Sequence, residues 1–277
     1  MRAFALLSVL AAMVAVPSPA RAQVEDIPST CIAMANALPN AIYANLSPAG
    51  TKFRIDPAAM AAPEVKITFA GHSTYVIETP AGVTIATDYS GWAGPGVTPR
   101  VVTMNKAHAT HFTSFPDPAI EHALTGWNPD GGPARHRLKV DDVYIRNVTT
   151  DIRSFDGGME ADGNSIFIFE VAGLCIGHLG HLHHRLEDRH FAAIGRLDIV
   201  MVPVDGGLTL SHEGMTEITR RLQSSIVLPM HRRGMAISSF IAMMGETFAT
   251  DFRDGRSFTV SLATLPRRPT ILVLEGI

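Results

Sequence analysis

The chain has 277 residues, of which 46% are hydrophobic and 18% charged, so it carries enough apolar material for a large folded core. Its net charge of −3 and its lack of a long basic run give no indication of a nucleic-acid partner. After residue 22, no apolar stretch reaches the length of a membrane-spanning helix.

An apolar run near the N-terminus predicts a cleaved export signal. Arg2 supplies a positive charge, Phe4–Val16 forms the apolar segment, and Ala20-Arg21-Ala22 has the small-x-small pattern of a signal peptidase site. The run is too short to span a bilayer comfortably, although an uncleaved anchor stays an alternative. We therefore expect a signal peptide over residues 1–22 and a periplasmic or secreted protein with no membrane attachment after cleavage.

Residues 23–63 are expected to form an N-terminal extension, partly helical around Cys31–Leu38. The chain has only two cysteines, Cys31 and Cys175. In an oxidising compartment they could pair. A buried free thiol at Cys175, which lies in an apolar run, is equally compatible with the sequence, because the sequence does not fix the distance between the two side chains.

The remaining chain, residues 64–277, is interpreted as one domain. Apolar runs bounded by turn residues predict strands at Val65–Phe69, Thr74–Thr79, Val83–Thr87, Arg100–Met104, Val143–Val148, Ser165–Glu170, Leu174–Ile176, Ile199–Val204, Ile226–Met230 and Thr270–Leu274. Helical spacing predicts helices at Leu186–Ile194, Glu213–Leu222 and Ile237–Phe248, and residues 112–136 are expected to be a long loop with one short helix near Ile120. Hairpins followed by strand–helix alternation favour sheets covered by helices.

Three of these strands are followed directly by histidines. His108 and His111 follow one strand, residues 178–184 include four histidines at the end of another, and His231 ends a third. Neutral imidazole is a good zinc ligand, and strand ends are where α/β proteins usually place their sites. The other histidines are expected on loops, helix surfaces or solvent-facing turns and to be dispensable: His122, His136, His183, His184, His190 and His212.

The order of several short segments resembles the metallo-β-lactamase superfamily over residues 64–275. The segments are Gly71-His72-Ser73-Thr74, Thr87-Asp88, the His108/His111 turn, His178-Leu179-Gly180, Pro203-Val204-Asp205-Gly206-Gly207 and Pro229-Met230-His231. The resemblance is closest to the branch that includes L-ascorbate-6-phosphate lactonase. It implies an αββα sandwich with one or two metal ions at one edge.

The chain departs from the family's ligand pattern His-x-His-x-Asp-His. Lys106 replaces the first histidine of the turn and Thr110 its aspartate, while the later stretch Val148–Asp151 lacks the family's next histidine. The resemblance therefore implies that one of the two family metal sites is empty or weak. Because this dinuclear set is broken, β-lactamase activity itself is not expected.

The other family site implies a mononuclear centre with a histidine-dominated ligand set. It retains His111 and His231, and His181 aligns with the family's bridging aspartate. His108 could be a fourth ligand or could hold the metal-bound water. His72 is expected to support the ligands rather than bind. One divalent ion is expected, Zn²⁺ first, with Mn²⁺ or Fe²⁺ as alternatives.

Three further side chains are candidates for catalysis. The resemblance places Asp88 beside the metal, although a strand-end cap explains it equally well, and Asp205 is a weaker candidate base. Lys106 could neutralise an anionic substrate or a developing oxyanion, or could fill the vacated metal position with its charge.

The expected function is a metal-dependent hydrolase that directs a metal-bound hydroxide at a small-molecule lactone, ester, amide or phosphodiester. The alternatives are a non-catalytic metal- or ligand-binding protein on the same fold, and a scaffold with no metal. The sequence does not indicate an oligomeric state.

Overall fold

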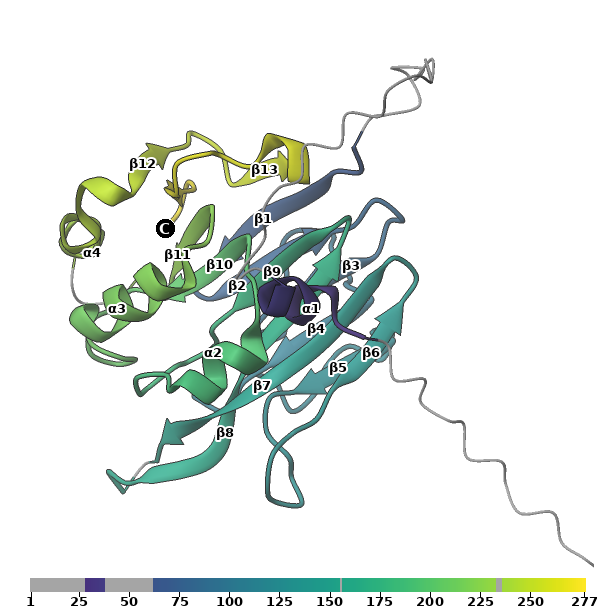
Figure 1. Ribbon diagram of the computed structural model, residues 1–277. Coiled ribbons are helices and arrows are strands. Elements are labelled where there is room, and N and C mark those ends of the chain that lie inside the picture. Colours follow the sequence, from purple (N-terminus) through teal and green to yellow (C-terminus); the bar gives the residue numbers. More distant parts are fainter. Residues whose placement is uncertain (1–27, 38–61, 155, 233–235) are drawn as a thin grey trace, which may run out of the picture.

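Two β-sheets stacked face to face form the centre of the fold (Figure 1). The computed structural model describes residues 28–37, 62–154, 156–232 and 236–277. The expected signal peptide and most of the N-terminal extension lie outside these described residues. No helix in the described ranges is long and apolar enough to cross a membrane.

The first sheet has six strands in the order β13-β1-β2-β3-β4-β5. Its strands are β1 (Val65–Gly71), β2 (Thr74–Glu78), β3 (Thr84–Ala86), β4 (Val101–Met104), β5 (His122–Thr125) and β13 (Ser257–Val260). Strands β1 to β3 form an antiparallel meander, whereas β3, β4 and β5 run parallel to one another. The carboxyl ends of β3 and β4 therefore reach the same edge of this sheet.

The second sheet has eight strands in the order β12-β14-β11-β10-β9-β8-β7-β6. Its strands are β6 (Arg137–Val140), β7 (Val143–Arg153), β8 (Met159–Val171), β9 (Leu174–His178), β10 (Ile199–Pro203), β11 (Ile226–Met230), β12 (Ala249–Phe252) and β14 (Thr270–Val273). Strands β9, β10 and β11 are parallel neighbours and are buried along their whole length. Their carboxyl ends form a second row of loops beside the ends of β3 and β4.

Strand alternation builds the core between the sheets. In β1, Ile67 and Phe69 are buried while the intervening Lys66 is exposed, as expected for side chains that alternate across a strand. They pack in one apolar cluster with inward residues of the other sheet, among them Phe167 and Phe169 of β8. Burial of this kind is the main favourable contribution to the free energy of folding.

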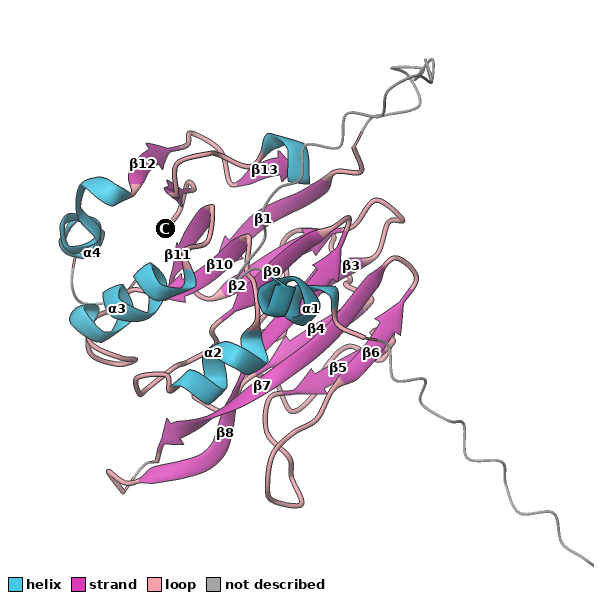
Figure 2. Ribbon diagram, viewed as in Figure 1, coloured by secondary structure: helices cyan, strands magenta, loops and turns pink. Residues whose placement is uncertain are grey.

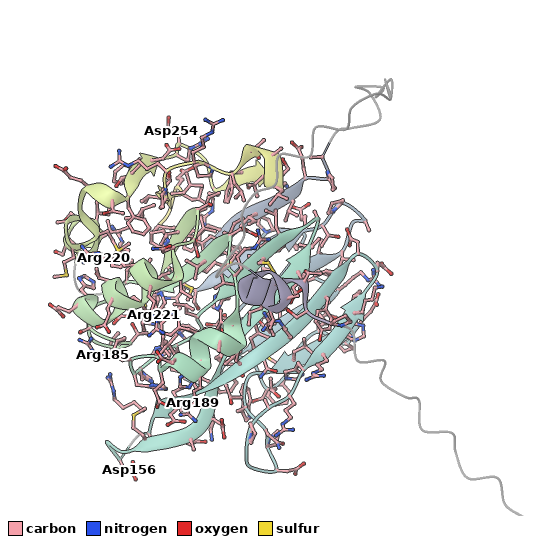
Figure 3. All side chains as sticks on the ribbon, viewed as in Figure 1. Asp156, Arg185, Arg189, Arg220, Arg221 and Asp254 are labelled. Atoms are coloured by element: carbon pink, nitrogen blue, oxygen red, sulfur yellow. A yellow bond between two sulfur atoms is a disulfide. The ribbon has the colours of Figure 1, made fainter. Side chains whose placement is uncertain are left out.

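Four helices, α1 (Thr30–Ala37), α2 (Asp188–Ile194), α3 (His212–Leu222) and α4 (Ile237–Met244), lie over the outer face of the eight-stranded sheet (Figure 2). They pack on the outward residues of that sheet, such as Val200 and Val227. Figure 3 shows Arg189 and Arg221 on the solvent side of this layer. The outer face of the six-stranded sheet is covered, in the described part of the chain, by loop residues that include Tyr89 and Trp127. This arrangement confirms the expected α/β sandwich.

The main difference from the expected elements lies in residues 112–136. The structure has strand β5 at His122–Thr125, paired in parallel with β4, where a short helix near Ile120 was expected. A four-residue, half-exposed strand at a sheet edge has no alternating apolar pattern to reveal it. The strands β6, β12 and β13, each four residues long, were also not among the expected strands.

A disulfide joins the N-terminal helix to the sheet, which decides between the two alternatives for the cysteines. Cys31 of α1 and Cys175 of β9 are bonded, with their Cα atoms 6.0 Å apart and 144 positions apart in sequence (Figure 3). Beside it, the Glu170 carboxylate accepts hydrogen bonds from the Ser29 and Thr30 side chains and from Arg146. The segment around α1 is thus part of the folded domain.

Because the disulfide closes a loop of this length, it should lower the entropy of the unfolded chain substantially. We predict that Cys31→Ser lowers the free energy of unfolding by about 2–5 kcal/mol, measured by urea denaturation. Reductant should destabilise the wild type by a similar amount and leave the variant unaffected. Equal stability of the oxidised and reduced wild type would contradict this prediction.

Candidate metal centre

Histidines from three strand ends converge on one space at the rim of the sandwich. His72 follows β1, His108 and His111 follow β4, and His231 follows β11. One ring nitrogen from each of these four residues lies within 4.8 Å of the others. A single cation could therefore contact several of these nitrogens at once.

His181, which follows β9, is the fifth imidazole of this cluster. Its ring centroid lies 4.6 Å from that of His111, 4.7 Å from that of His231 and 5.0 Å from that of His108. The Nε2 atoms of four of the five residues are buried and have no hydrogen-bond partner among the described residues: His72, His111, His181 and His231. A buried polar atom without a partner costs about 1–3 kcal/mol, so these atoms indicate a place for a ligand.

Asp88 fixes the orientation of His111. Its Oδ2 accepts a hydrogen bond from His111 Nδ1 at 2.7 Å, and its Oδ1 accepts one from Asn105 Nδ2 at 2.8 Å. Burial favours a raised pKa for Asp88, but His178, His111 and the hydrogen bonds from His111 and Asn105 outweigh it and hold the pKa below its usual range. Asp88 is therefore an anion, His111 carries its proton on Nδ1, and the lone pair of His111 Nε2 faces the cluster.

Asp205 holds His231 in the same way. Its Oδ2 accepts hydrogen bonds from His231 Nδ1 at 2.8 Å and from the Thr209 hydroxyl, and its Oδ1 accepts from the backbone N–H groups of Gly207, Leu208 and Thr209. Burial opposes ionisation, yet these donors hold the pKa of Asp205 well below its usual range. Both oxygens are fully engaged, so the geometry favours a role in orienting His231 over the role of a catalytic base.

The backbone at these positions is held in an uncommon conformation. His72, Asp88 and His231 all have positive φ, at 52°, 42° and 54°. Non-glycine residues rarely occupy this region, and each such residue costs about 1–3 kcal/mol. The His72 carbonyl accepts a hydrogen bond from the His231 backbone N–H at 2.7 Å, which ties two of the strained residues to each other.

His72 lies closer to the centre than expected. The sequence suggested a supporting role, but its ring centroid is 4.2 Å from that of His231 and its nitrogen belongs to the group of four. Burial and the neighbouring imidazoles of His231, His111 and His108 lower the pKa of His72 to about 3. It is therefore neutral at physiological pH and available as a nitrogen ligand.

His178 positions backbone rather than joining the cluster. Its buried ring donates from Nε2 to the Ser73 carbonyl at 2.9 Å, and its Nδ1 accepts from the Gly180 backbone N–H at 3.0 Å. This side chain therefore links the turn that carries His72 to the loop that carries His181.

His183 and His184 were expected to face solvent, but both are only partly exposed and are held by backbone groups. His183 Nδ1 accepts a hydrogen bond from the Arg153 backbone N–H at 2.8 Å, and its Nε2 lies 3.0 Å from His181 Nδ1. His184 Nε2 accepts from the Asp151 backbone N–H. The long β7–β8 hairpin, whose length the sequence did not reveal, brings these backbone groups to the loop.

Two other histidines that were expected on surfaces are buried structural residues. His190 closes the N-terminal turn of α2, and its Nδ1 accepts from the Glu187 backbone N–H. His212 contacts the Val204 carbonyl through Nε2 at 2.8 Å. Both expectations were wrong because each imidazole finds a buried backbone partner, one within its own helix start and one in the preceding loop.

Lys106 is found in a surface ion pair. Its Nζ lies 2.5 Å from Glu160 Oε1, and both side chains are substantially exposed. This placement does not support the idea that Lys106 fills a metal position with its charge. His108, two residues later, is in the cluster, and its Nδ1 lies 2.7 Å from the Thr110 hydroxyl.

A cavity of about 400 Å³ opens directly beside the imidazoles. Its lining includes His108, His181 and His183 on one side and Arg153 and Leu208 on the other. A small molecule in this cavity would contact the side chains of the cluster. The candidate donor atoms of the cluster are imidazole nitrogens, which suit zinc and other divalent transition metals better than Mg²⁺ or Ca²⁺.

Comparisons with known proteins agree with this fold. The structure is similar to a protein assigned as a Zn-dependent hydrolase of the metallo-β-lactamase superfamily from Thermotoga maritima, with 25% identity, a TM-score of 0.56, and coverage of 76% of this chain and 98% of that one. Two further neighbours share the fold: Igni18, a metallo hydrolase from Ignicoccus hospitalis (17% identity, TM-score 0.53, coverage 72% and 99%), and an isothiocyanate hydrolase from Delia radicum gut bacteria (11%, 0.51, 76% and 97%).

No curated protein matches the chain at a significant level. Residues 66–231 match the family model described as the beta-lactamase superfamily domain. This match includes every histidine of the cluster and both carboxylates that hold them, and it spans more than half of the chain. The protein therefore belongs to the beta-lactamase superfamily and has the fold of its metal-dependent hydrolases.

Proposed function

We propose that this protein is a metal-dependent hydrolase with a mononuclear, histidine-rich centre. The observation that carries the proposal is the pair of buried carboxylate–imidazole contacts, Asp88–His111 and Asp205–His231. Each contact leaves an Nε2 lone pair facing the same space, and neither Nε2 has a protein partner in the described residues. Such carboxylate–histidine pairs are typical of metal ligands.

His111 and His231 would be the principal ligands, with His72 and His108 completing the group of four nitrogens. A bound divalent ion, for which Zn²⁺ is our first choice, would polarise a substrate oxygen and lower the pKa of a coordinated water to about 7. Asp88 and Asp205 would act by fixing the tautomer and orientation of their imidazoles. The apolar packing behind the cluster keeps bulk water from these contacts.

The proposed substrate is a small molecule with a lactone, ester, amide or phosphodiester bond. The adjoining cavity has a volume suited to a small ligand. The superfamily fold hosts several hydrolytic reactions, so the bond type has to come from assay.

A non-catalytic metal-binding protein is the second candidate. The observation that favours it is that four imidazole nitrogens lie within 4.8 Å of one another, which is enough to fill a tetrahedral coordination shell. A closed shell would leave no position for substrate or water.

We also propose that the protein is exported to the periplasm or secreted. The disulfide between Cys31 and Cys175 supports an oxidising compartment, and the N-terminal apolar run supports cleavage. When the full chain is expressed in a Gram-negative host, the intact mass of the periplasmic protein should correspond to residues 23–277. A mass that includes residues 1–22 would contradict cleavage after Ala22.

Metal content and metal-dependent activity together distinguish the hydrolase from the non-catalytic metal-binding protein. Protein purified without chelator should contain about one tightly bound divalent ion per chain by elemental analysis. It should hydrolyse at least one member of a panel of lactones, esters, amides and phosphodiesters, lose that activity on chelation and regain it with added Zn²⁺. One ion without hydrolysis would favour the non-catalytic candidate, and two ions per chain would contradict a mononuclear centre.

The carboxylates can be tested separately from the ligands. We predict that Asp205→Asn lowers Zn²⁺ affinity at least 10- to 100-fold, measured by competition with a chelating dye. An asparagine that keeps accepting from the loop N–H groups turns its NH₂ group toward His231, which then carries its proton on Nε2. Asp88→Asn should change the tautomer of His111 in the same way and lower Zn²⁺ affinity.

Asp198→Asn is the matched control for these variants. Asp198 is also a buried aspartate, but it accepts from the Cys175 backbone N–H and pairs with Arg196, away from the cluster. This variant should lose stability and keep Zn²⁺ affinity. Unchanged affinity in Asp205→Asn and Asp88→Asn would show that these carboxylates do not hold metal ligands.

A further inference from the structure

The hydrogen-bond partners of His183 fix the position of its proton. Its Nδ1 accepts from the backbone N–H of Arg153 at 2.8 Å, and its Nε2 lies 2.9 Å from the backbone carbonyl of Leu208. An N–H can only donate and a carbonyl can only accept. His183 therefore has a bare Nδ1 and a protonated Nε2.

Neither backbone group can change its role or move away easily. Arg153 is the last residue of β7 and is paired with Met159 of β8. Leu208 lies in the loop whose N–H groups are held by Asp205. Burial, together with the charge of Arg153, lowers the pKa of His183 to about 4, so the ring is neutral at physiological pH.

The proton of His183 determines the tautomer of His181. His183 Nε2 lies 3.0 Å from His181 Nδ1, so its N–H points at both the Leu208 carbonyl and this nitrogen. If His181 Nδ1 also carried a proton, two N–H groups would face each other. His181 Nδ1 is therefore the acceptor, and the neutral ring carries its proton on Nε2.

Because His183 engages Nδ1, Nε2 is the ring nitrogen of His181 that remains for the histidine cluster. The residue is 3% exposed, and its Nε2 has no partner among the described residues. A protonated ring nitrogen has no lone pair to offer a cation, but it can donate to an oxygen. His181 is thus the opposite tautomer to His111 and His231, whose protons are held on Nδ1 by carboxylates.

We propose that His181 is a hydrogen-bond donor to the substrate rather than a metal ligand, and that it stabilises the negative charge that develops on the carbonyl or phosphoryl oxygen. This inference rests on the proposed hydrolase function, and it replaces the sequence-based expectation that His181 binds the metal. His181 also lines the cavity beside the cluster, where a substrate oxygen could reach it. Donors aimed at a developing oxyanion are among the largest contributions to catalysis.

The backbone around His181 is built to hold this donor in place. The His181 backbone N–H donates to Asn164 Oδ1 at 2.8 Å. Gly180, at a φ of +62°, has room for no side chain, because a Cβ atom would lie 2.4 Å from that oxygen and 2.5 Å from Asn105 Nδ2. Asn105 also contacts Asp88, so the donor and the His111 ligand are positioned by one network.

The first test reads the tautomer directly. Two-bond ¹H–¹⁵N correlation spectra of the ¹⁵N-histidine-labelled protein, with and without Zn²⁺, should show His181 protonated on Nε2 in both states. His111 and His231 are internal controls and should be protonated on Nδ1. A proton on Nδ1 of His181, or a metal-bound Nε2, would overturn the proposal.

The second test separates metal binding from turnover. His181→Ala should retain Zn²⁺ stoichiometry and affinity, while kcat for 4-nitrophenyl acetate falls about 100- to 1000-fold with a smaller change in KM. His181→Gln, whose side-chain amide still donates, should recover part of kcat. His231→Ala is the control and should lose the ion.

The outcomes distinguish this inference from the proposed function. A wild type that binds Zn²⁺ but hydrolyses neither 4-nitrophenyl acetate nor any member of the substrate panel would refute the hydrolase. Loss of Zn²⁺ from His181→Ala, or an unchanged kcat in that variant, would refute the donor role while leaving the hydrolase intact.

Discussion

The architecture of the candidate site depends on two buried carboxylates, each bound to one imidazole. Asp88 and Asp205 are both fully removed from water, which is costly for a charge unless several donors compensate it. The fold provides those donors through Asn105 in one case and through the 207–209 loop in the other. Once the carboxylates are held as anions, the tautomers of His111 and His231 follow, and with them the direction in which their lone pairs point. Strained backbone at Asp88 and His231 is the cost of bringing these groups together.

The sandwich and the converging strand ends could be predicted because they depend on patterns of many residues. Apolar runs such as Ile199–Pro203 and Ile226–Met230 are buried throughout, and a parallel arrangement sends their following residues to one edge. The resemblance of short segments then gave their order around the sheet. Histidines that directly follow fully buried strands, such as His231, were for this reason placed correctly at the rim. Short edge strands such as β5 pair with only one neighbouring strand, and the β5 sequence has no comparable apolar run.

The roles within the histidine-rich loop could not be predicted, because they depend on partners from distant segments. His181 and His183 are separated by one residue, and nothing in their local sequence distinguishes a ligand from a donor. What distinguishes them is the Arg153 backbone N–H, which arrives from the end of a hairpin strand, and the Leu208 carbonyl, which arrives from the loop after β10. Lys106 was likewise a catalytic candidate by sequence, and its ion-pair partner Glu160 comes from the distant strand β8.

The proposed ligand set would have a consequence for the charge of the centre. The sequence resemblance aligns His181 with the family's bridging aspartate, and Asp88 and Asp205 lie behind His111 and His231 rather than in the inner group of nitrogens. Neutral nitrogen donors leave more of a cation's positive charge available to an oxygen ligand than carboxylate donors do. An N–H from His181 directed at the same oxygen would add to this positive field. With a bound cation, the proposed centre would therefore favour substrates that gain negative charge on an oxygen during reaction, as carbonyl and phosphoryl compounds do, over those that develop positive charge.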